Sequence, residues 1–74
     1  MPIYNQLNNF FARMYKEVCE DPMCWGENTI IRCAGAADFV GSITEGEEHE
    51  AIVELWDKVW RPQFLGKIGR WDLI

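Results

Sequence analysis

Residues 2–20 read PIYNQLNNFFARMYKEVCE, and this stretch sets the expectation of a helical protein. Apolar residues recur in it at spacings of three and four, which places them on one face of a helix. They are Ile3, Leu7, Phe10, Phe11, Met14 and Val18. Pro2 suits the first turn, and Asp21-Pro22 ends the pattern because the residue before a proline avoids the helical backbone region. The sequence therefore predicts a helix over residues 3–20.

The second element can be interpreted in two ways. Residues 22–28 have the composition of a turn, and Asn28 is placed to cap a helix over residues 29–40 that stops at Gly41. The run 29–33 also fits a short β-strand, and a glycine inside the helix would weaken it by about 1 kcal/mol relative to alanine. We expect a helix here, with an α+β fold as the alternative if residues 29–40 form a strand or hairpin.

A third helix is expected over residues 45–60. Thr44 and Glu47 have the spacing of a capping box, in which each side chain accepts a hydrogen bond from the backbone N–H of the other residue. Apolar residues again recur at three and four along this stretch: Ile52, Leu55, Trp56, Val59 and Trp60. Pro62 is expected to end or kink this helix, because proline lacks the N–H that the helix interior needs. A short turn and tail would follow.

The chain has 74 residues, which is room for one domain with one core. A hydrophobic fraction of 49% and an aromatic fraction of 14% predict a folded chain. We therefore expect residues 1–74 to form a single all-α domain, a compact three-helix domain with a short C-terminal turn and tail. Because a core of this size contributes only about 3 to 5 kcal/mol, we also expect a homodimer that adds stability.

The net charge of −5 is unevenly distributed along the chain. Residues 1–57 hold three basic and eleven acidic side chains, a net −8, whereas residues 58–74 carry a net +3. An acidic chain lacks the cations that drive binding to phosphates, so we expect no direct nucleic-acid binding. No apolar run approaches the ~18 to 20 residues needed to cross a bilayer, and no secretory signal pattern is present. We expect a cytoplasmic protein with no membrane partner.

The strong soft metal ligands are Cys19, Cys24, Cys33 and His49. Structural zinc sites usually present cysteines in C-x2-C pairs, and the intervening lengths here are four, eight and fifteen residues. We therefore expect free thiols, a solvated histidine and no metal or other cofactor, with a small zinc-binding protein as an alternative. Catalysis by a cysteine with a histidine base is disfavoured, because so small a core leaves little volume for a substrate pocket. The chain is predicted not to be an enzyme.

Acidic side chains crowd the predicted third helix. Six carboxylates occupy the thirteen positions from Glu45 to Asp57, with no lysine or arginine among them. A solvated helix face explains such a cluster, and so does a surface that meets a basic partner and gains speed of encounter from the opposite charges. Lys58 follows Glu54 at the spacing of a favourable i, i+4 ion pair.

The aromatic and basic residues over 60–74 are candidate interface anchors, because tryptophan, phenylalanine and arginine contribute much of the binding energy at protein interfaces. They are also large enough to fill the chain's own core, which we expect for the tryptophans. With the acidic face, they complete the predicted partner-binding set: Glu47, Glu50, Glu54, Asp57, Trp60, Arg61, Phe64 and Trp71.

The sequence thus predicts a small, acidic, non-catalytic module that binds a protein with a basic surface. An inhibitor of the phage type, which occludes a nucleic-acid-binding site on its target, has this size, acidity and aromatic density, although that comparison is an analogy of type. A structural or accessory subunit of a larger complex is the alternative, in which the acidic face serves solubility alone.

Overall fold

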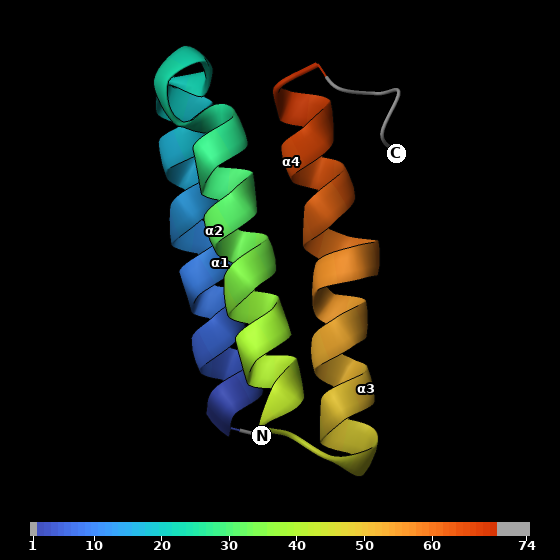
Figure 1. The fold of residues 1–74 in the computed structure, drawn as a ribbon. Helices are drawn as coiled ribbons and strands as arrows, with labels where there is room; N and C mark the ends of the chain where they lie inside the picture. The colour runs from blue at the N-terminus through green and yellow to red at the C-terminus, as the bar shows by residue number, and fades with distance from the viewer. Residues whose placement is uncertain (1, 70–74) are drawn as a thin grey trace.

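The computed structural model describes residues 2–69, with the backbone alone for residues 22–26. Three helical rods lie side by side, and the described residues include no strand (Figure 1). The elements are α1 (Pro2–Glu20), α2 (Pro22–Ser42), α3 (Gly46–Glu54), the π-helix η1 (Leu55–Trp60) and α4 (Arg61–Lys67). The last three follow one another without a break and form the third rod. The all-α prediction is confirmed, and the α+β alternative is wrong because residues 29–40 are helical.

The first helix forms as its apolar pattern predicts. α1 buries Leu7, Phe11 and Val18, which are spaced by four and seven residues and so share one face. The backbone N–H of Asp21 donates to the carbonyl oxygen of Glu17 at 3.0 Å and closes the last turn. The amphipathic pattern was therefore sufficient to predict this element.

The second helix begins earlier than predicted. α2 starts at Pro22, so the expected turn over residues 22–28 and the cap at Asn28 are wrong. Proline fits the first helical turn because its missing N–H would have no partner there. Asp21 is then the single residue between α1 and α2. The described buried positions of α2 recur every four residues: Thr29, Cys33, Ala37 and Gly41.

Thr44 caps the end of α2 and not the start of α3. Its hydroxyl donates to the carbonyl oxygen of Val40 at 2.9 Å, serving a carbonyl that the helix end leaves without a partner. The predicted capping box with Glu47 is therefore wrong, and α3 has Glu45 as its N-cap with no side-chain cap hydrogen bond. Gly46 turns the chain into α3 with a φ of +64°, a conformation that costs little only for glycine.

The third rod stays helical through Pro62, where the sequence predicted an end or a kink. The preceding turn, Leu55–Trp60, is π-helical, and the Arg61 N–H donates to the carbonyl oxygen of Trp56, five residues back. A proline ring normally clashes with the carbonyl four residues earlier, and the wider π turn accommodates it. The helix therefore continues to Lys67.

The third rod ends at Lys67, two residues before Gly69. The N–H of Gly69 donates to the Gly66 carbonyl at 3.2 Å, and Gly69 has a φ of +79°, as glycines that terminate helices often do. The predicted C-terminal tail, residues 70–74, lies outside the described residues.

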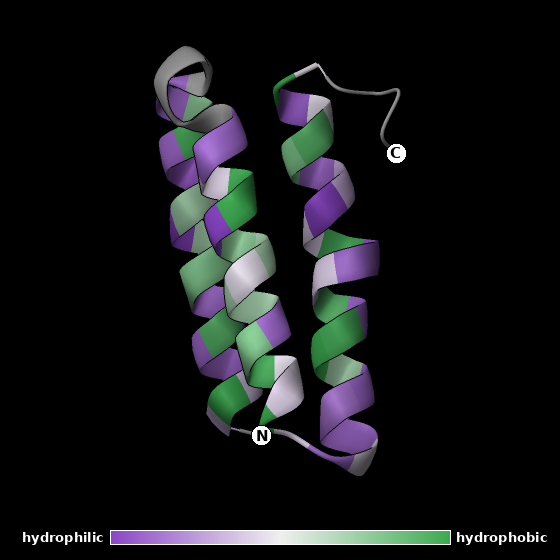
Figure 2. Cartoon of the chain, viewed as in Figure 1, coloured by the Kyte–Doolittle hydropathy of each residue, from purple (hydrophilic) through white to green (hydrophobic). Residues whose placement is uncertain are grey.

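An aromatic cluster joins α1 to the third rod and forms the centre of the core. The ring centroid of Trp56 lies 5.3 Å from that of Phe11 and 5.9 Å from that of Phe64. Tyr15 meets Phe64 edge to face at 5.4 Å. Phe11 and Phe64 are fully buried. In Figure 2 the third rod is hydrophilic where α3 begins, and hydrophobic and hydrophilic residues alternate along the rest of it.

Candidate functional site

The predicted acidic face is exposed along the third rod. We call Glu47, Glu50, Glu54 and Asp57 the acidic ridge, and all four side chains are exposed. The predicted i, i+4 pair is confirmed, with Lys58 Nζ 3.4 Å from Glu54 Oε1. Both side chains of that pair are well exposed, so the ion pair is weak and offsets little of the negative charge of the ridge. The ridge therefore presents carboxylates to solvent.

Two of the predicted aromatic anchors pack within the protein's own core. Phe64 is fully buried, so the structure removes it from the surfaces a partner can reach. Trp60 is half-buried, and its indole Nε1 donates to Asn8 Oδ1 on α1 at 2.9 Å. Arg61 is half-buried, and Trp71 lies outside the described residues. The self-packing expected of the tryptophans is confirmed for Trp56 and Trp60.

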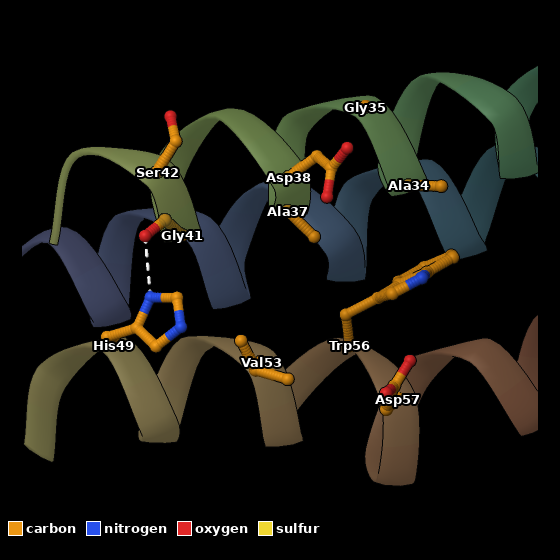
Figure 3. Close-up of a pocket in the computed structure, with 10 residues that line it drawn as sticks. All are labelled: Ala34, Gly35, Ala37, Asp38, Gly41, Ser42, His49, Val53, Trp56 and Asp57. Atoms are coloured by element: carbon orange, nitrogen blue, oxygen red, sulfur yellow. Dashed lines mark hydrogen bonds between the residues drawn. The ribbon is translucent and has the colours of Figure 1, made fainter. Parts of the chain in front are cut away.

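A groove of about 580 Å³ lies between α2 and the third rod (Figure 3). It is partly open to solvent, and small side chains on α2 leave the space that it occupies. His49 lies at one end of it, and Trp56 and Asp57 lie at the other, with Asp38 on the α2 wall (Figure 3). The lining residues are Ala34, Gly35, Ala37, Asp38, Gly41, Ser42, His49, Val53, Trp56 and Asp57.

The groove was not predicted from the sequence, which was expected to leave little volume for a pocket of several hundred cubic ångströms. That expectation concerned interior volume, whereas this space lies between two helices at the surface. The sequence did contain an indication of this groove. Ala34, Ala37 and Gly41 follow one another at spacings of three and four, and small residues at such spacings on one helix leave room beside a neighbouring helix.

His49 is exposed, as expected, and is also held in place by a hydrogen bond. Its ring Nδ1 lies 2.6 Å from the carbonyl oxygen of Gly41 at the end of α2 (Figure 3). Because the carbonyl can only accept, Nδ1 carries the hydrogen. A Cβ placed on Gly41 would lie 3.7 Å from the His49 ring, which is ordinary contact, so the two helices approach closely here. The histidine therefore links the α2 terminus to α3.

Replacing His49 with alanine is expected to lower the free energy of unfolding by about 1 kcal/mol, the usual contribution of one hydrogen bond. Urea denaturation, monitored by circular dichroism, measures the change. Glu50→Ala is the matched control, because Glu50 is exposed on the same helix and such surface changes stay within about 0.5 kcal/mol. Equal stability of the two variants would show that the His49–Gly41 contact contributes nothing.

Neither of the described cysteines, Cys19 and Cys33, is among the residues that line the groove. Cys33 is fully buried in the core, and this burial raises the pKa of its thiol to about 12. Such a thiol stays protonated near neutral pH and is a poor nucleophile or metal ligand. Cys19 is exposed on α1. Burial raises the pKa of the neighbouring Tyr15 hydroxyl, and Cys19 adds to that shift by its charge and a hydrogen bond.

The described part of the chain contains no set of side chains that could hold a zinc ion. No group of three or more histidine, cysteine, aspartate or glutamate side chains is close enough there to hold a metal ion. Cys24 belongs to residues 22–26, whose side chains lie outside the description. Elemental analysis of purified protein tests the zinc alternative, since one equivalent of zinc would indicate that the cysteines are metal ligands.

Comparison with protein-family models, curated proteins and solved structures gave no match. The geometry and charge of the protein itself therefore carry the inference of its function. Among the described residues, no helix has both the length and the apolar character that a membrane crossing requires.

Proposed function

We propose that this protein is a non-catalytic, cytoplasmic binding module that meets a basic surface on another protein and covers it. The observation that supports this proposal is the acidic ridge, whose four carboxylates are exposed on one continuous helical rod. A surface that normally receives nucleic acid has the complementary charge, so an inhibitor that occludes such a surface is the favoured form of the module. The proposed contact set is the ridge with the half-buried Trp60 and Arg61, and Trp71.

The charge of the ridge favours association with a cationic partner more than it favours folding. Like charges along one face repel one another, and a basic partner relieves that repulsion on binding. Complementary potentials chiefly raise the rate of encounter and select among partners, and they do so most strongly at low ionic strength. The proposed module should therefore associate faster as salt is lowered.

Reversing two ridge charges, Glu50→Lys with Glu54→Lys, is expected to slow association with a captured partner by about tenfold at low salt. The salt dependence of the association rate should also become weaker, because fewer opposite charges attract across the interface. A partner is first captured from a lysate of the native host, and surface plasmon resonance at several salt concentrations then measures the rates.

The matched control is Glu17→Lys with Glu20→Lys. It changes the net charge equally on exposed positions of α1, away from the ridge. Association of the control should stay within about twofold of the original protein. An unchanged association rate and salt dependence in the ridge variant would disprove the electrostatic mechanism.

Exposed apolar side chains favour a second candidate, a subunit of a larger assembly or a homodimer. Phe39 and Ile43 on α2 are 65% and 57% exposed. A second, smaller groove of about 250 Å³ lies between α1 and α2, and Ile3, Phe10 and Val40 are among its lining residues. Size-exclusion chromatography and thermal melting at several protein concentrations separate the two candidates. A stable monomer whose melting temperature is independent of concentration would count against the assembly.

A further inference from the structure

We infer that the groove between α2 and the third rod receives an arginine side chain of the protein partner, with the guanidinium between Asp38 and Asp57. The inference rests on the proposed function and locates its specific contact. It differs from that proposal in placing recognition in a shaped site and not along the whole ridge. Three properties of the groove lead to it: its charge, its aromatic wall and its size.

Both walls of the groove carry a carboxylate. Asp38 comes from α2 and Asp57 from η1, and both line the same space (Figure 3). Neither has an ion pair or hydrogen bond within the part of the chain that the structure describes. The ten lining residues include no lysine or arginine. The groove is therefore a place where an incoming cation meets two uncompensated negative charges.

The end of the groove at Asp57 has an aromatic wall. Trp56 lines the groove next to Asp57, and its indole extends across toward Ala34 (Figure 3). A guanidinium is planar, packs well against aromatic rings and donates five N–H groups in a fixed arrangement. It can therefore reach two carboxylates while it packs against an indole, which the compact lysine ammonium does less well. This combination favours arginine over lysine.

The groove is also large enough to admit an arginine side chain. A volume of about 580 Å³ lies within the ~300 to 1,000 Å³ range of sites for small ligands. Gly35 forms part of the α2 wall, and a Cβ built on it would meet nothing within 4 Å. The space beside this glycine is therefore open, so a Cβ atom can be added there without a clash.

The probe for this site is the capped tripeptide acetyl-Gly-Arg-Gly-amide. Its control carries citrulline, which has nearly the same shape without the charge. Titration is followed by two-dimensional ¹H–¹⁵N NMR. The expected result is a set of shift changes concentrated at the amides of Gly35, Asp38 and Asp57 and at the Trp56 indole, with a dissociation constant of about 1 to 10 mM. The citrulline peptide should leave these signals unchanged.

Two variants test the groove itself. Asp38→Asn with Asp57→Asn should weaken tripeptide binding by about threefold to tenfold, the range expected for losing two exposed charge contacts. Gly35→Leu should abolish binding by filling the groove, and the change is compatible with the helix because leucine favours it more than glycine. Glu17→Gln with Glu20→Gln removes the same charge from exposed positions of α1 that are outside both the groove lining and the acidic ridge, so binding should stay within about twofold.

Several outcomes would overturn the inference. Shift changes spread evenly along the acidic ridge, or equal effects of the two charge-neutralising variants, would mean general attraction and not a site. Shift changes with the citrulline peptide would show that binding does not depend on charge. Binding of 1,4-diaminobutane without binding of the tripeptide would assign the groove to a free amine and not to a protein side chain.

The test separates this inference from the proposed function. If the tripeptide fails to bind but the captured partner still loses affinity on reversal of Glu50 and Glu54, the ridge mechanism stands and the groove site is refuted. If the tripeptide binds in the groove but the ridge variant associates normally, the cation site stands and the ridge mechanism is refuted. The captured partner should then lose affinity in Gly35→Leu.

Discussion

Replacement of Phe64 with alanine is expected to lower the free energy of unfolding by about 3 to 5 kcal/mol and so to unfold most of the protein. Phe64 is fully buried, and it contacts Trp56 and Tyr15 at centroid distances of 5.9 and 5.4 Å. Removing a buried phenylalanine costs its transfer free energy and leaves a cavity. A core of this size contributes only about 3 to 5 kcal/mol in total, so little stability would remain.

Circular dichroism at neutral pH measures the loss of helix, and Phe64→Leu provides a milder variant whose stability can be measured in urea. The matched control is Phe39→Ala, because Phe39 is 65% exposed and its removal should change stability by less than about 0.5 kcal/mol. If Phe64→Ala and Phe39→Ala had the same stability, the aromatic cluster would not be the centre of the core. A stable Phe64→Ala variant would also return this residue to the candidate partner contacts.

Helical periodicity predicted the fold class but not the helix boundaries. α1 was predicted to within one residue because its apolar spacing is regular and a proline follows at residue 22. The same proline, which correctly marks the end of α1, also opens α2, and the sequence was interpreted only in the first sense. Proline ends one helix and starts the next with equal ease, so the residue type alone does not distinguish a loop from a junction.

The other boundary errors have related causes. Thr44 was assigned to the following helix, but its hydroxyl can also serve the preceding one, and that choice depends on the tertiary path of the chain. Pro62 was expected to end a helix, but the π-helical turn before it allows the rod to continue. A π turn has no strong sequence signature, since it depends on packing of neighbours such as Trp56 against other helices.

The candidate site was predicted in part. The acidic ridge follows from spacing on a single helix, which periodicity gives directly. The groove requires two helices to lie side by side, and it combines Asp38 with Asp57 across nineteen positions of sequence. No local pattern relates these two residues. The role of Phe64 was misjudged for a similar reason, because an aromatic residue near a chain end suits a core and an interface equally.

The stability of the protein is expected to fall by about 4 kcal/mol between pH 9 and 12 through the Cys33 thiol alone. Burial raises the pKa of this thiol from about 9 to about 12. Below pH 9 the thiol is protonated in both folded and unfolded chains, so its full contribution is present. Above pH 9 only the unfolded chain ionises, and folding becomes less favourable by about 1.4 kcal/mol per pH unit until the folded thiol also ionises.

Urea denaturation of the original protein and of Cys33→Ala at pH 8 and pH 10.5 isolates this effect. Tyrosines and lysines titrate in the same range, but they do so in both proteins, so the difference between the two reports Cys33. The variant should be less stable at pH 8 by about 1 kcal/mol, because it loses a small buried group. By pH 10.5 the original protein should have lost about 2 kcal/mol more than the variant, which reverses their order. Parallel losses in the two proteins would mean that Cys33 ionises as easily in the folded chain as in the unfolded one, and that water reaches the centre of the core.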